Sequence, residues 1–357
     1  MKQNRIVSTW VFLLFICTMG TSIARSKFRK VDSSLPCIKT RFVGNNNYYS
    51  LTNSHLEEYP IFKIFDKDFF FDNLLPNQPI PVRNHSDQMV DGAQLKTLIE
   101  ELLVEIKQKK KTFTHFIVLQ NKDFNEKKQW GLMVLKFKDY PYVLKLFIET
   151  PESFVRPFDK GFEPIFFFLM GGGVNRHLTG FTRIKNAHYL RDLLKTDAYW
   201  SQHIDIPNKW FWLPKQESWI EIVGYNIGSQ PIQTIQIPGT YAIIADAICE
   251  KDKLSLWQKD HRQMALNLCN FTDLYIDPHI KNFMIEDKTN LLVIVDTEHF
   301  PSVVGFKQVK HYHSYSRWFS SLVAKCTRDI YFRDKTTRRK AQYDSQLYIT
   351  QHHIKVC

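Results

Sequence analysis

The chain has 357 residues, of which 44% are hydrophobic and 24% are charged. This balance excludes an intrinsically disordered chain and leaves room for one large domain or two lobes with buried cores. The net charge of +12 suits contact with anions, but the basic runs carry no interleaved aromatic residues, so we expect no specific binding of nucleic acid.

The N-terminus predicts a cleaved export signal over residues 1–24. Lys2 and Arg5 make its start positive, residues 10–19 form an apolar run, and residues 22–24 offer small side chains for cleavage. The apolar run is shorter than a membrane span requires. We therefore expect a secreted or exported protein with no stable membrane span after signal removal. An uncleaved anchor is the alternative.

The first half of the chain predicts an extension, a helix and a meander of strands. Residues 25–90 read as an N-terminal extension without long regular elements, because prolines and an asparagine run interrupt them. Residues 94–107 predict a helix, since apolar residues recur there at helical spacing. Short polar turns separate three strand candidates, which cover residues 113–119, 130–137 and 142–148.

The second half alternates helices and strands. The predicted helices cover residues 162–170, 187–196 and 254–268, and the tail 311–357 is mostly compatible with helix. The predicted strands cover residues 210–213, 219–223, 283–286 and 291–295, while 241–248 fits either a strand or a helix. The glycines at 171–173 have three open interpretations: a hinge, a close packing site or an anion-binding nest.

The most informative residues are Asp277, Asn282 and Asp296. Asn282 follows Asp277 by five positions, and Asp296 ends the apolar run 291–295. In phosphoryl transfer, one carboxylate orients the attacking hydroxyl, while an Asn and a second acid in this order hold metal ions. A carboxylate after a buried strand is costly unless it is paired or binds a metal. The alternatives are a turn Asp, a turn Asn and a helix cap.

This arrangement resembles the catalytic and metal-binding loops of the protein-kinase-like superfamily, and His279 adds some likeness to the aminoglycoside and choline kinases. The resemblance implies an α+β, two-lobed kinase-like fold with a compact C-terminal lobe. The N-lobe would cover residues 91–250 and the C-lobe residues 251–357. Asp277 would orient a hydroxyl-bearing acceptor, either a protein or a small molecule. ATP would be the nucleotide, with Mg²⁺ held by Asn282 and Asp296.

The resemblance also implies residues that anchor the nucleotide. Lys145 lies in a strand similar to the one whose lysine contacts the α and β phosphates, and Lys136 is the rival candidate. Glu163 is the expected acidic partner of that lysine, with Glu152 as the next candidate. Glu298 is a candidate second metal ligand.

The sequence also departs from the kinase pattern. Residues 121–131, where a phosphate-covering loop is expected, lack its repeated glycines. Tyr275 and Ile276 replace the usual His and Arg, and no glycine follows Asp296 closely. These departures favour an alternative, a catalytically inactive pseudoenzyme that binds a partner protein or a nucleotide. A structural surface protein without nucleotide is a third interpretation. Residues 241–248 would line the adenine or form a plain core strand.

Overall fold

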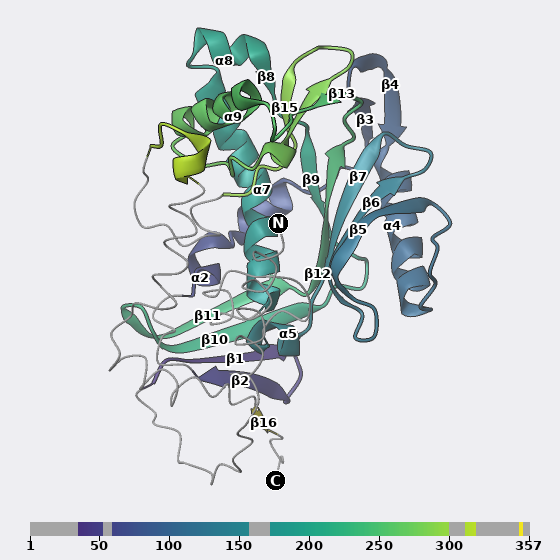
Figure 1. Cartoon of the computed structure of the whole chain (residues 1–357). Coiled ribbons are helices and arrows are strands. Elements are labelled where there is room, and N and C mark those ends of the chain that lie inside the picture. Colours follow the sequence, from purple (N-terminus) through teal and green to yellow (C-terminus); the bar gives the residue numbers. More distant parts are fainter. Residues whose placement is uncertain (1–34, 53–58, 157–171, 300–310, 319–349, 353–357) are drawn as a thin grey trace, which may run out of the picture. The chain divides into compact units, whose positions relative to one another are not determined.

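The computed structural model describes residues 35–52, 59–156, 172–299, 311–318 and 350–352 (Figure 1). Every described helix and strand belongs to one unit, residues 36–357. This unit mixes helices with several mainly antiparallel sheets, so the predicted α+β class is confirmed. The predicted export signal and the predicted helix 162–170 lie outside the described residues.

A five-stranded antiparallel sheet, here named the cavity sheet, carries much of the candidate site. Its strands, in spatial order, are β5 (Phe116–Asn125), β6 (Trp130–Phe137), β7 (Tyr142–Ile148), β12 (Thr240–Asp246) and β9 (Lys209–Trp212). The predicted bounds of β6 and β7 are confirmed. The prediction for β5 was wrong at both ends, because polar residues up to Asn125 continue to pair with β6 across two bulges.

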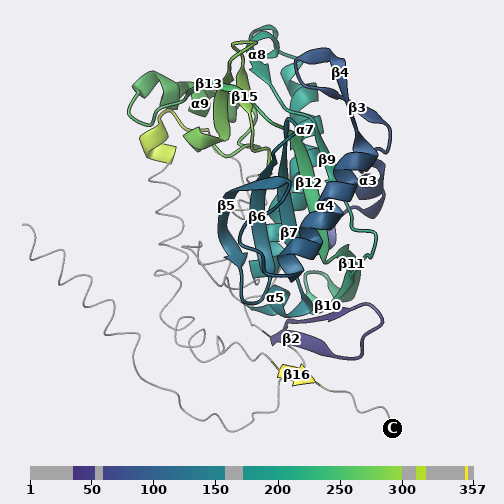
Figure 2. The same ribbon diagram turned by 90° about the vertical axis from the view of Figure 1, so that its right-hand side faces the viewer.

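Helix α4 (Gly92–Lys107) covers one face of the cavity sheet (Figure 2). The Asp91 side chain caps the helix by accepting a hydrogen bond from Ala93 N–H at 2.9 Å. Leu95, Ile99 and Leu102 recur at helical spacing and are fully buried against the sheet. The helix predicted at 94–107 is therefore confirmed with an earlier start.

Helix α7 (Gly172–Leu194) packs on the opposite face of the cavity sheet. The sequence predicted a separate helix at 187–196, and its start was wrong because one continuous helix covers residues 172–194. Gly172 and Gly173 belong to this helix, whereas Gly171 lies outside the described residues. Gly173 lies in its first turn, where a Cβ atom would come within 2.7 Å of the Ser153 hydroxyl on α5 (Pro151–Val155). Close packing is therefore the interpretation that the contacts of Gly173 support.

A second five-stranded antiparallel sheet contains strands from both ends of the chain. Its strands, in order, are β11 (Gln230–Pro238), β10 (Trp219–Ile227), β1 (Cys37–Phe42), β2 (Tyr48–Thr52) and β16 (Thr350–His352). Smaller elements of the predicted extension are α2 (Ile61–Ile64), α3 (Lys67–Asp72), β3 (Pro79–Val82) and β4 (His85–Asp91). These elements are short, as predicted, but β1 pairs with β10 over its whole length.

The C-terminal part of the described chain forms a smaller sheet and helices. The strands, in order, are β13 (Glu250–Lys253), β14 (Phe283–Glu286), β15 (Leu292–Ile294) and β8 (Ile204–Asp205), and the helical elements are α8 (Ala198–His203), α9 (Lys259–Phe271) and η1 (Ile280–Asn282). The hairpin of β14 and β15 is confirmed. Helix α9 begins at Lys259 rather than at the predicted Leu254. Among the described helices, none combines the length and apolarity needed to cross a membrane.

Candidate functional site: a cavity between two sheets

A cavity of about 760 Å³ lies between the cavity sheet, helix α7 and the hairpin of β14 and β15. Val134 on β6 and Lys145 on β7 belong to its wall, as do residues 246–248, which leave strand β12. Met284 on β14 and Asp296, just after β15, complete the wall on the hairpin side. The volume falls within the range of about 300–1,000 Å³ that is typical of small-molecule sites.

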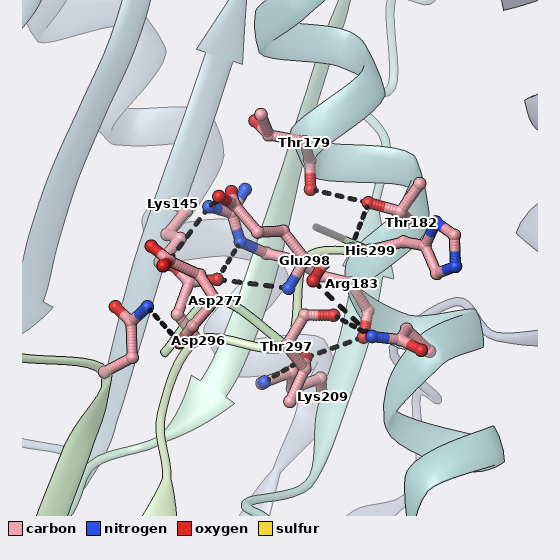
Figure 3. Close-up of polar contacts among 12 residues, drawn as sticks. Lys145, Thr179, Thr182, Arg183, Lys209, Asp277, Asp296, Thr297, Glu298 and His299 are labelled. Atoms are coloured by element: carbon pink, nitrogen blue, oxygen red, sulfur yellow. Dashed lines mark hydrogen bonds and ion pairs between the residues drawn. The ribbon is translucent and has the colours of Figure 1, made fainter. Parts of the chain in front are cut away.

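Asp296 is the centre of an ion network on this cavity (Figure 3). Its Oδ2 accepts hydrogen bonds from Lys145 Nζ and from Arg183 Nη2, each at 3.1 Å. Its Oδ1 accepts from Arg183 Nε at 2.8 Å, and Arg183 Nη2 also donates to Glu298 Oε2 at 2.8 Å. The network therefore joins β7, α7 and the segment after β15, which are far apart in the sequence.

Burial and the charges within this network shift the pKa values of its members. Burial alone would raise the pKa of Asp296, but the charges of Arg183 and Lys145 outweigh it and hold that pKa well below its usual value. Burial lowers the pKa of Lys145, and the nearby Arg183 charge acts in the same direction. Burial raises the pKa of Glu298 to about 7, with the negative charge of Asp296 as the next cause.

Strand alternation explains why Lys145 faces the cavity. Leu144 and Leu146 point into the core beneath α4, so Val143 and Lys145 lie on the other face and line the cavity. The rival candidate Lys136 is exposed and also lines the cavity, but the lysine that contacts Asp296 is Lys145.

The loop that carries Asp277 and Asn282 is tied to Asp296 by backbone contacts. The Asn282 side-chain amide donates to the Asp277 carbonyl oxygen at 3.2 Å, and His279 N–H donates to Asp277 Oδ1 at 3.0 Å. Val295 N–H donates to the Asn282 carbonyl oxygen at 2.9 Å. The three predicted residues Asp277, Asn282 and Asp296 are therefore held in one region.

The environment of Asp277 brings its titration close to neutrality. Burial raises the pKa of Asp277 to about 6, and the nearby charge of Asp296 contributes in the same direction. Hydrogen bonds from His279 and Asn282 partly oppose the shift. A carboxylate with this pKa is ionised at neutral pH and is more basic than an ordinary Asp, which suits it to accept a proton.

Helix α7 anchors both loops of the site. The Asn186 amide donates to the backbone oxygens of Tyr275 at 2.8 Å and Thr297 at 3.1 Å. The Thr297 hydroxyl donates to the Arg183 carbonyl oxygen at 2.8 Å and accepts from Lys209 Nζ at 2.6 Å. These bonds fix the residue that follows Asp296 and the Tyr275 end of the loop that carries Asp277.

The end of β12 and the two residues after it also line the cavity. The sequence left open whether residues 241–248 form a strand or a helix, and the structure shows a strand that ends at Asp246. Asp246 accepts a hydrogen bond from Asn208 N–H at 2.8 Å, and Ala247 N–H donates to the Pro141 carbonyl oxygen at 2.8 Å. Burial raises the pKa of Asp246 to about 6.

Neither glutamate that the sequence suggested as a partner of Lys145 is found beside it among the described residues. Glu163 lies outside the described residues. Glu152, the next candidate, forms an ion pair with Arg156 and is not among the residues that line the cavity. The contact of Lys145 with an acid is instead the one with Asp296.

The turn between β5 and β6 offers no glycine-rich cradle. The Asn125 side chain accepts from the backbone N–H groups of Lys127 and Lys128, each at 3.1 Å, and closes the turn. Gly131 has a φ of 118°, and a Cβ atom there would come within 3.0 Å of Phe124 Cα. This glycine therefore serves the close approach of the two strands.

The residues present fit a magnesium ion that is completed by a substrate. Among the described residues, no group of three or more His, Cys, Asp or Glu side chains converges as a metal cluster. Magnesium is usually bound through one or two carboxylates together with phosphates and water. Asn282, Asp296 and Glu298 all line the cavity, and Asn282 and Asp296 would supply such a partial ligand set.

Sequence reasoning missed Arg183 and Lys209, which are 5% and 7% exposed. A single arginine inside a helix carries no signal that separates a buried position from a solvated one. The sequence analysis assigned no helix to residues 174–186, so the position of Arg183 on the wall of the cavity was not foreseen.

No protein-family model matches this sequence, and neither a curated protein nor a solved structure resembles it significantly. The geometry of the cavity and the motif are therefore the observations from which a function can be inferred.

Proposed function

We propose that this chain is a kinase-like phosphotransferase that moves the γ-phosphoryl group of ATP to a hydroxyl acceptor. The carrying observation is the contact of Lys145 on β7 with Asp296, beside the bonded pair Asp277 and Asn282. A lysine on the third strand of a sheet, a following helix and then Asp, Asn and Asp in this order match the protein-kinase arrangement. The same order supports a two-lobed fold, with lobes at 91–250 and 251–357.

Each residue has a role in this proposal. The segment 246–248 borders the base of the nucleotide, and Lys145 binds its phosphates. Asp277 accepts or orients the proton of the acceptor hydroxyl. Asn282 and Asp296 hold magnesium, which shields the charge of the transferred phosphate when it is bound. The acceptor is a hydroxyl-bearing protein or small molecule.

The test is calorimetric titration of the full chain with ATP, with and without magnesium. Asp296→Asn removes the metal-binding charge, and Asp287→Asn, in the exposed turn between β14 and β15, is the matched control. We expect binding that requires magnesium, that is lost in Asp296→Asn and that persists in Asp287→Asn. Circular dichroism checks that both variants are folded. No binding at millimolar ATP by the folded wild-type chain would contradict the proposal.

A catalytically inactive pseudoenzyme is the second candidate, and the occupation of Asp296 favours it. Both carboxylate oxygens of Asp296 already accept hydrogen bonds from cations, and the β5–β6 turn lacks a glycine cradle. This candidate predicts nucleotide binding that is indifferent to magnesium, or no nucleotide binding at all, and no consumption of ATP.

Export is a separate part of the proposal, and it follows from residues 1–24. Expression of the full chain in a secreting host, followed by mass measurement of the product, tests it. A secreted product that lacks these residues is expected, whereas a retained, full-length product would contradict a cleaved signal.

A further inference from the structure

Arg183 has donor capacity that the protein does not use. Its Nε and Nη2 atoms are bonded to Asp296 and Glu298, whereas its buried Nη1 has no hydrogen-bond partner among the described residues. Buried polar groups in native proteins nearly always have a partner, so an unpaired one calls for an explanation. Because Arg183 also lines the cavity, a ligand there is the natural source of an acceptor.

Metal binding at Asp296 would increase this unused capacity. Oδ1 accepts from Arg183 Nε, and Oδ2 is shared by Lys145 Nζ and Arg183 Nη2. Because Oδ2 already accepts from two cations, a metal ion that coordinates this oxygen displaces Lys145 or Arg183 from it. A buried cation that loses its carboxylate partner is strongly unfavourable unless another anion replaces that partner.

The phosphates of the nucleotide are the anions that would be available. The guanidinium group is planar and offers parallel N–H donors that match phosphate oxygens, while a lysine binds them only as a point charge. Lys145 and Arg183 approach the same oxygen of Asp296 from β7 and α7 respectively. If Lys145 serves the α and β phosphates, Arg183 on the helix side is placed for the phosphate beyond them.

We infer that Arg183 is the residue that binds the terminal phosphate of the nucleotide. Arg183 exchanges part of its contact with Asp296 for the γ-phosphate when the metal complex binds, and Glu298 keeps its other nitrogen in place. The inference depends on the proposed function, because it requires a nucleotide in this cavity. It assigns a cation on α7 to a site where protein kinases use a glutamate to hold the lysine.

The test compares the affinities for ATP and ADP, both with magnesium, by calorimetry on the full chain. Arg183→Lys keeps the charge but removes the planar fork of donors. We expect the affinity for ATP to fall about ten- to a hundredfold and that for ADP to change by less than about threefold. The preference for ATP over ADP would therefore collapse.

Arg191→Lys is the matched control on the same helix. Arg191 donates to the Pro207 carbonyl oxygen at 2.8 Å and is not among the residues lining the cavity, so its replacement should leave the ATP-to-ADP ratio unchanged. If Arg183→Lys weakens ATP and ADP equally, Arg183 is only a structural counter-ion and the inference is overturned, while the proposed function stands. If the wild-type chain binds neither nucleotide, both are overturned.

A second variant covers the case in which Arg183→Lys does not fold. The double variant Arg183→Gln with Glu298→Gln removes Arg183 together with the second acid that it contacts, so Glu298 is not left buried without its cation. The expected result is the same loss of preference for ATP over ADP. A preserved preference in this folded variant would overturn the inference.

Discussion

Helix α7 buries polar side chains in opposite ways near its N-terminal end and at its middle. His177, near the N-terminal end, is 0% exposed and lies among the rings of Phe154, Phe181 and Tyr241, with centroid distances of 5.0–5.1 Å. Its Nε2 is 2.7 Å from the Pro238 carbonyl oxygen. Arg183, two turns further on, is 5% exposed and binds two carboxylates.

This difference separates a structural polar group from a candidate functional one. Burial lowers the pKa of His177 to about 4, so the imidazole is neutral and completes an aromatic core. Burial acts on Arg183 in the same direction, but Asp296 and Glu298 outweigh it and raise the pKa of Arg183 above its usual value. Perturbed charges that face a cavity are typical of functional sites, whereas a neutral buried imidazole is typical of a core.

The largest effect should come from Asp277, whose loop is anchored to α7 by the bond from Asn186 to Tyr275. Asp277→Asn should lower the proposed phosphoryl transfer roughly 10²- to 10⁴-fold, because the proposed proton acceptor is lost. The free energy of unfolding at neutral pH should not fall, since burial disfavours the carboxylate. ATP consumption and chemical denaturation provide the two measurements. The exposed Asp273→Asn is the control, and full activity in Asp277→Asn would argue against catalysis by this loop.

Removal of Arg183 should have the next largest effect. Arg183→Met leaves Asp296 and Glu298 buried with Lys145 as the remaining contact, which should lower the free energy of unfolding by about 3–5 kcal/mol. Lys185→Met on the same helix has an exposed side chain and should change it by less than about 0.5 kcal/mol. Urea unfolding compares the two variants, and equal effects would remove the distinction between buried network and surface pair.

The loss of folding stability in acid that comes from His177 should be smaller. Because the folded-state pKa of His177 is about 4 and the unfolded value about 6.5, the unfolded state binds the extra proton between these pH values. The stability that this provides is present above pH 6.5 and is lost as the pH falls toward 4, by about 3 kcal/mol. His177→Gln should flatten the pH dependence of unfolding, while the exposed His203→Gln should not. An unchanged profile in His177→Gln would mean that this imidazole titrates alike in the folded and unfolded states.

The local features of the site followed from the sequence. Strand β7 was predicted with its observed bounds, and simple alternation placed Lys145 opposite the core residues Leu144 and Leu146. The spacing of Asp277, Asn282 and Asp296 predicted their association, because a hairpin of β14 and β15 connects them. Short-range periodicity and turn chemistry were sufficient for these elements.

Long-range relations did not follow. Cys37 on β1 lies opposite Tyr225 on β10, and no local pattern selects such a distant pairing. Helix α7 was missed as a unit because its buried side includes Asn175, His177 and Arg183, so the apolar periodicity that identifies a helix is weak there. The partners of His177 and Arg183, the Pro238 carbonyl oxygen and the Asp296 carboxylate, come from elsewhere in the fold, which a single sequence does not display.

Gly180 lies between His177 and Arg183 on α7, and its substitution should give the smallest effect. A Cβ atom there would meet the Tyr241 ring, with Cζ at 2.9 Å, and Phe147 Cζ at 3.1 Å. Gly180→Ala gains about 1 kcal/mol of helix propensity but overpacks the contact with β12 at a cost of about 1–3 kcal/mol, so a small net destabilisation is expected.

The hydroxyl of Tyr241 makes this prediction specific. It is buried without a hydrogen-bond partner among the described residues and stands nearest to the missing Cβ of Gly180, so Tyr241→Phe alone should be neutral or slightly stabilising. In the Tyr241→Phe background, Gly180→Ala should cost less than in the wild-type chain, because the closest clashing atom is gone. Thermal unfolding of the four proteins gives the coupling energy. If the effects of the two substitutions are strictly additive, the contact between the new Cβ and the Tyr241 hydroxyl does not determine the cost of Gly180→Ala. Backbone movement would then accommodate the added methyl group.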